Sequence, residues 1–260
     1  MAGRSTGRPG AAPPADPAER LRARAARFAA VGEPVRLAIV EHLALGDAAP
    51  SELGALVDLP SNLLAHHLKV LEEAGLVRRI RSEGDRRRSY VRLRLEDPAV
   101  ATLVGPRLAD VADLAARLGE PGAAGRVVFV CTHNSARSQL AAAAWERVSD
   151  LPATSAGTRP AARVPPRAVS TARRHGLRLA GRRPQPRDAP ARHGDRLVAV
   201  CDNAYEDLDP AGDRPGARLH WSVPDPVRVG TDAAFETAYD DIDRRVRHLA
   251  GTLGRQERPT

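Results

Sequence analysis

Residues 127–138 read VVFVCTHNSARS, an apolar run that ends in Cys131 and continues through a polar loop to Arg137. Four consecutive apolar residues are typical of a parallel strand that is buried on both faces. From Ser138 to Val148 the sequence favours a helix, so the loop joins a strand to a helix. Backbone N–H groups in such a loop can converge on an anion, and the helix dipole adds to the attraction. The segment therefore predicts an oxyanion site.

The residue types in this loop also predict reactivity. An anion-binding loop favours the thiolate form of cysteine, which is the nucleophile. Arg137 can donate two hydrogen bonds to two oxyanion oxygens. A cysteine and an arginine six positions apart often occur by chance in an arginine-rich chain, and the alternative is a buried, inert Cys131. The position of the pair between a strand and an alanine-rich helix favours a nucleophilic site.

The rest of the C-terminal half repeats the alternation of strand and helix. Residues 197–200 form a second apolar run, and residues 233–253 favour a last helix. Strands that alternate with helices predict an α/β fold with an open parallel sheet, here over residues 126–255. Residues 119–125, which lie within LGEPGAAG, have the composition of a linker.

The N-terminal half predicts a winged helix-turn-helix domain over residues 17–118. The pattern is helical from Pro17 to about Leu45, with a break at Gly32. We expect Ser51 to open a short helix and Ser61 to cap a longer one that Gly75 ends. A hairpin with a turn at residues 82–85 follows, and another helix runs from Pro98 to Leu114 with a break near Gly105 and Pro106. In such a domain the second helix of the pair enters the major groove of DNA.

The charge of the hairpin fits a nucleic-acid partner. Residues 78–94 hold eight arginines and two acids, and Arg86, Arg87 and Arg88 are adjacent. This density suits a wing that follows DNA phosphates. The alternative is an ordinary solvated hairpin in a basic protein, and the preceding helix pair argues against it.

Composition restricts the remaining possibilities. The chain has 260 residues, a net charge of +8 and two cysteines, too few for a disulfide framework. Residues 1–16 lack apolar periodicity, so we expect a disordered tail, with a basic DNA-binding arm as the alternative. No signal peptide or membrane-spanning run is present in the sequence, and we expect a cytoplasmic protein that does not contact a membrane.

Residues 66–77, HHLKVLEEAGLV, closely resemble the reader helix of the ArsR family of small repressors. The resemblance implies a homodimer that binds a double-stranded DNA operator, with pairing through residues 21–30 and 100–114. It assigns DNA contacts to Ser61, Asn62, His66, Lys69, Arg86, Arg87 and Arg88, whereas His67 is expected to pack structurally. Residues 1–125 contain no cysteine, so the soft-metal site of the arsenic-responsive members is missing and no metal is expected.

The loop at Cys131 resembles the low-molecular-weight protein tyrosine phosphatases, and among them the thiol-linked arsenate reductases, whose loop commonly reads CTxNSxRS. Residues 155–158, 200–202 and 221–226 match as well. The resemblance implies an arsenate- or phosphate-like oxyanion as ligand and makes Asp225 the general acid beside Cys131 and Arg137. The implied substrate-binding residues are Thr132, His133, Asn134, Ser135, Ala136 and Ser138.

Two features favour arsenate reduction over phosphoester hydrolysis. Val227 stands where phosphatases usually carry an aromatic residue, and Asn134 and Ser135 are adjacent in the loop. Reduction requires a second thiol to resolve the adduct on Cys131. Cys201 either supplies that thiol or belongs to the core. Leu208 stands where thioredoxin-coupled enzymes carry a further cysteine.

The reductant is therefore expected to be external, either a low-molecular-weight thiol with a glutaredoxin-like partner or thioredoxin, and no bound cofactor is expected. We expect a DNA-binding regulator fused to an arsenate reductase-like enzyme for arsenical resistance. The first alternative is a tyrosine phosphatase with a DNA-binding domain. The second is a repressor without enzymatic activity, in which the C-terminal domain senses an oxyanion or arsenite and changes operator affinity.

Overall fold

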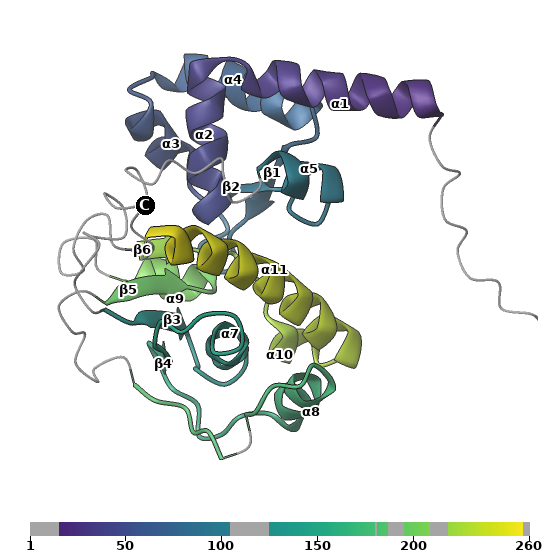
Figure 1. Cartoon of the computed structure of the whole chain (residues 1–260). Helices are drawn as coiled ribbons and strands as arrows, with labels where there is room; N and C mark the ends of the chain where they lie inside the picture. Colours follow the sequence, from purple (N-terminus) through teal and green to yellow (C-terminus); the bar gives the residue numbers. More distant parts are fainter. Residues whose placement is uncertain (1–15, 105–124, 180, 187–194, 209–217, 257–260) are drawn as a thin grey trace, which may run out of the picture.

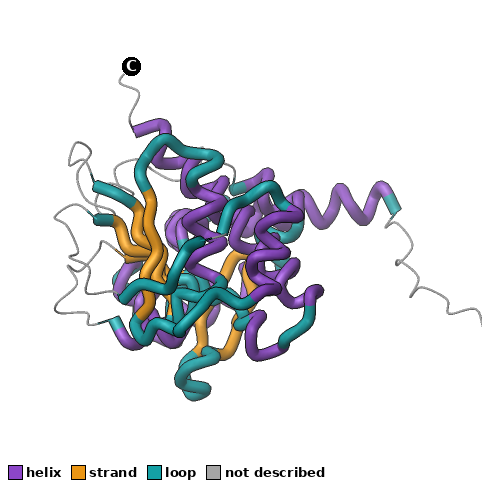
Figure 2. The backbone as a smooth tube through the Cα atoms, turned by 90° about the horizontal axis from the view of Figure 1, so that it is seen from below, coloured by secondary structure: helices purple, strands orange, loops and turns teal. Residues whose placement is uncertain are grey.

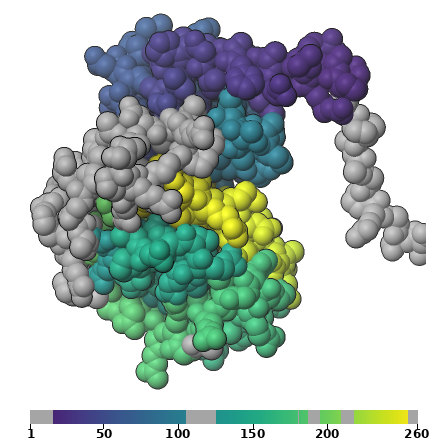
Figure 3. Space-filling model, viewed as in Figure 1, coloured from purple at the N-terminus to yellow at the C-terminus, as the bar shows by residue number. Residues whose placement is uncertain are grey.

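The computed structural model describes residues 16–104, 125–179, 181–186, 195–208 and 218–256. A helical part with a β-hairpin lies on top of an α/β part, and the long helix α11 runs along the boundary between them (Figure 1). Helix α1 projects away from the body of the molecule (Figures 2 and 3). The expected tail before residue 16, the break at Gly105 and Pro106 and most of the expected linker lie outside the described residues.

The N-terminal part has the predicted order of helices followed by a hairpin. Its elements are α1 (Pro17–Val31), α2 (Pro34–Leu45), α3 (Pro50–Leu56), α4 (Ser61–Glu73), β1 (Val77–Arg81), β2 (Ser89–Leu93) and α5 (Pro98–Leu103). The hairpin strands are antiparallel, with Val77 opposite Leu93 and Arg81 opposite Ser89. Leu64, Leu68 and Leu71 recur at helical spacing on α4 and are buried in the core of this part.

Local chemistry explains where these helices begin and end. The Glu33 carboxylate accepts hydrogen bonds from the backbone of Val35 and Arg36 at 3.0 and 2.9 Å, which caps α2. Ser61, expected as the cap of α4, is instead its first residue, because Pro60 occupies the cap position without a side-chain hydrogen bond. Gly75 has a φ of +69° and ends α4, as predicted.

The C-terminal part is the predicted open parallel sheet. The described strands are β3 (Val127–Cys131), β4 (Ala153–Gly157), β5 (Arg196–Ala199) and β6 (Arg218–His220), in the order β4–β3–β5–β6. The described helices are α7 (Arg137–Trp145), α8 (Pro166–Arg174), α9 (Asp202–Asp207), α10 (Pro226–Val229) and α11 (Asp232–Gln256). Strand β3 is buried along its whole length, as a central strand covered on both faces should be.

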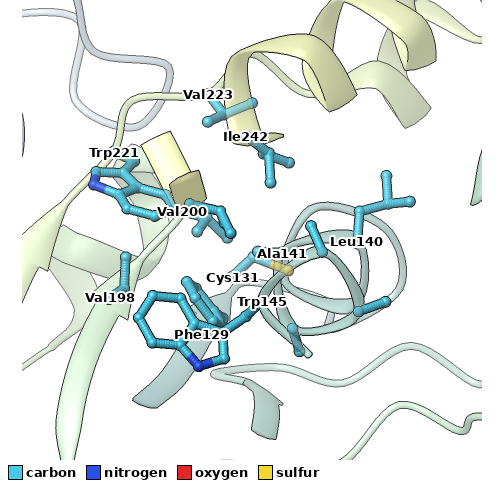
Figure 4. Packing of buried hydrophobic residues seen from close by; sticks show 14 of the residues in the cluster. Phe129, Cys131, Leu140, Ala141, Trp145, Val198, Val200, Trp221, Val223 and Ile242 are labelled. Carbon is cyan, nitrogen blue, oxygen red and sulfur yellow. The ribbon is translucent and has the colours of Figure 1, made fainter. Parts of the chain in front are cut away.

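The core of this part supports the end of β3. Phe129 lies between the rings of Trp145 on α7 and Trp221 after β6, at centroid distances of 6.0 and 5.7 Å. Figure 4 shows Cys131 beside these residues, close to α7. The side chains that surround the cysteine on this side are apolar and fully buried, so the end of β3 is fixed by packing.

The two parts are joined by a buried network of four charged side chains. Arg92 on β2 contacts both carboxylate oxygens of Asp241 on α11 at 2.6 Å. Arg245 contacts Asp241 at 3.2 Å and reaches Asp47, after α2, at 2.9 and 3.1 Å. Asp47 also accepts a hydrogen bond from the backbone of Ser222 at 2.7 Å. The network therefore ties the winged helix to both α11 and the segment after β6.

Removal of one member should destabilise the fold, because the remaining charges stay buried without their partner. We expect Asp241→Asn to lower the free energy of unfolding by about 3 kcal/mol in urea titrations. Asp240→Asn removes an exposed charge next to it on α11 and serves as the control, with a change of less than about 0.5 kcal/mol. Equal effects of the two substitutions would contradict the role of the network.

The contribution of Asp241 to the free energy of unfolding should also depend on pH. Burial raises the pKa of Asp241, but Arg245 and Arg92 outweigh it and hold the pKa at about 2, below the ordinary 3.8. The stabilisation is therefore complete above about pH 4 and is lost as the pH falls towards 2. The stability difference between the wild type and Asp241→Asn should shrink over that interval, and a difference independent of pH would contradict the assignment.

Candidate active site at the end of strand β3

Cys131 lies at the end of β3, and its sulfur is held by the loop that follows. The backbone N–H of Asn134 donates to Sγ at 3.2 Å, and the Ser138 hydroxyl lies 3.1 Å from Sγ. The Asn134 side chain in turn donates to the Ser138 hydroxyl at 2.9 Å. These contacts place hydrogen-bond donors around the sulfur of the residue that the sequence predicts as the nucleophile.

Asn134 takes a backbone conformation that the loop requires. Its φ is +47°, a left-handed value that asparagine tolerates better than most residues. Its side-chain oxygen accepts from the Gln139 amide at 3.1 Å and from the Gln185 backbone at 2.8 Å. Gln139 and Gln185 were not among the predicted site residues, because their contacts with Asn134 give no sequence signal.

Gly157 ends β4 directly beside the loop. A Cβ on this residue would lie 2.9 Å from the Thr132 carbonyl oxygen and 3.0 Å from the Asn134 backbone nitrogen. Both neighbours are backbone atoms, which cannot move aside without distorting the loop. This close approach explains why a glycine stands in the segment from Ser155 to Thr158.

Arg137 is the first residue of α7, and its side chain is 4% exposed. One terminal nitrogen donates to the Val223 carbonyl at 2.9 Å, and the other lies 3.4 Å from the Asp225 carboxylate. Burial lowers the pKa of Arg137, but Cys201, Cys131, Asp225 and Glu83, which are negative when ionised, outweigh it and raise the pKa. The guanidinium therefore stays charged inside the site.

Asp225, predicted to be the general acid, caps the short helix α10. Its carboxylate accepts from the Val227 backbone at 3.1 Å and faces Arg137. The structure thus brings Asp225 to the Cys131 loop across nearly a hundred residues of sequence. Val227, two residues after Asp225, is exposed and stands where the resemblance to phosphatases implies an aromatic residue.

Cys201 follows β5 and lies beneath the loop, fully buried. Its sulfur is 3.5 Å from the Thr132 hydroxyl and accepts from the Ala204 backbone at 3.4 Å. Burial raises the pKa of the Cys201 thiol, and the neighbouring charge of Cys131 adds to the increase, whereas Arg137 opposes it. The second thiol is therefore neutral in this arrangement but directly beneath the first loop residue.

The other predicted loop residues differ in exposure. His133 is exposed at the rim of the loop. The side chains of Thr132, Ser135 and Ala136 are buried within it. Within the described residues no cluster of three or more His, Cys, Asp or Glu side chains could hold a metal ion. The same part of the chain contains no helix that is both long and apolar enough to cross a membrane.

The turn of the wing, residues 82–85, lies against this site, which the sequence did not reveal. The backbone N–H of Glu83 donates to Asp202 at 2.7 Å. The Ser82 hydroxyl and the Asp85 backbone N–H donate to Glu206 at 2.6 and 2.9 Å. The Glu83 carboxylate lies 3.4 Å from Arg137. The contacting residues are more than 50 positions apart, so no local pattern could predict them.

The candidate DNA contacts lie on α4 and on the hairpin, and those on α4 share one exposed surface. Ser61, Asn62, His66 and Lys69 are all exposed there. His67 is partly buried, with its ring nitrogen 3.4 Å from Glu33, which agrees with the expected structural role. Arg86, Arg87 and Arg88 are exposed on the hairpin, next to the turn that packs against Asp202 and Glu206. Arg92 is buried in the ionic network, so it does not belong to the basic face of the wing.

Residues 126–259 match the low molecular weight phosphotyrosine protein phosphatase family, and residues 31–80 match a helix-turn-helix domain. The first match covers more than half of the 260 residues, so the chain belongs to the low molecular weight phosphotyrosine protein phosphatase family. It joins an N-terminal ArsR-type helix-turn-helix domain to a phosphatase domain that resembles arsenate reductases.

Individual relatives correspond to one half of the chain. An arsenate reductase from Halalkalibacterium halodurans is 31% identical over 134 residues, which cover 48% of this chain and 95% of that protein. The crystal structure of arsenate reductase from Archaeoglobus fulgidus is 26% identical, with a TM-score of 0.43 and coverage of 48% and 99%. The tyrosine phosphatase Wzb from Escherichia coli K30 is 24% identical, with a TM-score of 0.46 and coverage of 50% and 98%.

The contact at Gly157 gives a direct test of the loop geometry. We expect Gly157→Ala to weaken binding of inorganic phosphate by at least about tenfold in calorimetric titrations, because the new methyl group displaces the backbone around Cys131. Ser155→Ala changes the same strand without this contact and should bind phosphate like the wild type. Unchanged phosphate affinity in Gly157→Ala would show that the loop does not bind the oxyanion.

Proposed function

We propose that this protein is a DNA-binding transcriptional regulator fused to a thiol-dependent arsenate reductase. The observation that carries the enzymatic half of the proposal is the second thiol beneath the Cys131 loop. Cys201 is buried, 3.5 Å from the Thr132 hydroxyl, in a chain with two cysteines. A hydrolytic enzyme needs a single nucleophile, whereas reduction of arsenate needs two thiols to supply two electrons.

In the proposed first step the Cys131 thiolate attacks the arsenic of arsenate. An S–As bond forms, one As–O bond breaks, and the departing oxygen takes a proton from Asp225 and leaves as water. Arg137 and the loop N–H groups hold the remaining oxygens. The adduct still contains arsenic(V), so this step alone transfers no electrons to the product.

In the second step a thiolate attacks the Cys131 sulfur. An S–S bond forms and the S–As bond breaks with its electron pair on arsenic, which leaves as arsenite. If Cys201 is this thiol, its proton passes to an oxygen of the leaving arsenite, and the product is a buried Cys131–Cys201 disulfide. Leu208 is buried where a third cysteine would continue the exchange, so the disulfide is reduced from outside. A low-molecular-weight thiol with a glutaredoxin-like partner, or thioredoxin, serves as this external reductant.

Hydrolysis of aryl phosphates is the second candidate activity. Membership of the phosphatase family and the position of Asp225, 3.4 Å from Arg137, support it. Val227, which is small and exposed, offers no aromatic ring for stacking on a phosphotyrosine. The two activities share the first nucleophilic step and differ in their need for Cys201.

Substitution of the two cysteines separates these activities. We expect Cys131→Ser to abolish both arsenate reduction and aryl phosphate hydrolysis, because a hydroxyl is not ionised in the loop. Cys201→Ser should remove reductase turnover, measured by arsenite release with several thiol systems, and spare aryl phosphate hydrolysis. Asp225→Asn should slow the first step of either reaction.

The outcomes have different meanings. Reductase turnover that is unchanged in Cys201→Ser would assign resolution to an external thiol. If the protein hydrolyses aryl phosphates but releases no arsenite with any thiol system, the proposed activity is phosphatase and not arsenate reductase.

For the N-terminal half we propose binding to a double-stranded DNA operator as a homodimer. The exposed face of α4 presents Asn62 and His66 for base edges, and the arginines of the hairpin supply phosphate contacts. Leu21 and Phe28 on α1 are 63% and 55% exposed, and Phe28 borders a groove between α1 and α5. Exposed apolar residues beside a groove support pairing of two chains through α1 and α5.

Base and phosphate contacts should respond differently to substitution. We expect Arg87→Ala to weaken binding to all DNA sequences and to reduce the salt dependence by roughly one unit. Asn62→Ala should weaken binding to the operator and leave non-specific binding unchanged. Arg247→Ala removes the same charge from an exposed position on α11 and is the control. If Arg87→Ala weakened binding to the operator but not to other DNA, the assignment of Arg87 to phosphate contacts would be wrong.

A further inference from the structure

The candidate active site has a wall that comes from the DNA-binding domain. Both oxygens of the Glu83 carboxylate accept from the Asp225 backbone N–H, at 3.2 and 3.1 Å. The same carboxylate lies 3.4 Å from Arg137 and 3.2 Å from Arg228. A single acid of the wing turn therefore contacts the arginine expected to hold the oxyanion and the residue expected to protonate the leaving oxygen.

The wing turn is fixed in this position. Tyr90 on β2 donates its hydroxyl to Glu206 at 2.9 Å, next to the bonds that Ser82 and Asp85 make to the same carboxylate. A Cβ on Gly84 would collide with the Glu206 side chain, so the turn approaches α9 as closely as glycine allows. Asp202, which accepts from the Glu83 backbone, is itself held by the buried His220 ring at 2.9 Å. Glu83 is thus part of a built surface.

A carboxylate beside an anion site favours anions that carry a hydroxyl proton over anions that carry none. An ionised carboxylate only accepts hydrogen bonds, so it repels a bare oxyanion oxygen and attracts a hydroxyl group. At neutral pH hydrogen phosphate and hydrogen arsenate keep at least one hydroxyl proton. Sulfate has the same tetrahedral shape but carries no proton, and the dianion of an aryl phosphate carries none either. A site that is built to bond a hydroxyl rejects the analogue that lacks it.

We propose that Glu83 is a specificity-determining residue that makes the Cys131 site prefer protonated tetrahedral oxyanions over unprotonated ones, by accepting a hydrogen bond from their hydroxyl group. The inference deepens the proposed function, on which it rests, because arsenate belongs to this class of anions. It makes the wing of the DNA-binding domain part of the substrate site. Arg137 binds the ionised oxygens of the ligand, and Glu83 binds its protonated oxygen.

The test compares inorganic phosphate with sulfate on the full chain by calorimetric titration at neutral pH. We expect the wild type to bind phosphate at least about tenfold more tightly than sulfate. In Glu83→Gln the neutral amide can donate to a bare oxygen, so the preference should fall to about threefold or less, chiefly through tighter sulfate binding. Asp85→Asn is the matched control: it removes a neighbouring charge of the same turn whose carboxylate pairs with Arg87, and should keep the wild-type ratio.

Each outcome decides the proposal. Equal affinity of the wild type for phosphate and sulfate, or a ratio that Glu83→Gln leaves unchanged, overturns it. A ratio that collapses equally in Asp85→Asn also overturns it, since the effect would then come from the net charge of the turn. The binding ratio is measured without turnover. If the protein selects phosphate through Glu83 but releases no arsenite, the reductase proposal fails and the specificity proposal stands.

Discussion

The buried contacts of Arg92 and Arg245 with Asp47 and Asp241 determine how this molecule is arranged. Each arginine is almost completely buried and pairs with an acid from the other half of the chain. Charges removed from water in this way tolerate few alternative geometries, because a displaced partner leaves an uncompensated charge. The network therefore fixes the orientation of the winged helix on the α/β part, including the hairpin strand that carries Arg92.

The position of the wing follows from this constraint. With Arg92 anchored at one end of β2, the turn before that strand reaches Asp202 and Glu206, and Glu83 enters the surroundings of Arg137. The turn is then unavailable to DNA, whereas the exposed arginines beside it remain accessible. In the proposed function an anion at Arg137 and DNA at the hairpin would contact the same structural element, and coupling between them would require two positions of this element that the ligands distinguish.

The sequence was most informative where chemistry is local. The run from Val127 to Val130 predicted the central strand, and the spacing of the leucines in α4 predicted the buried face of that helix. The Cys131 loop could be predicted because its donors are close in sequence. Glu83 could not, since its contact with Arg137 depends on how two domains dock. Arg92 was grouped with the basic residues of the wing because composition does not distinguish a solvent-facing arginine from one paired with an acid 149 residues away.

The wing turn is docked on the C-terminal domain, and hydrogen exchange of the backbone amides of this turn measures the docking directly. The N–H groups of Glu83 and Asp85 donate to buried or half-buried carboxylates of α9. In the full chain these two amides should exchange at least about 100-fold more slowly than those of an unstructured peptide. The amide of Arg86, an exposed residue of the same hairpin, provides the internal reference. Exchange of Glu83 and Asp85 at the unstructured rate would show that the wing is free of the C-terminal domain and would contradict the docked arrangement.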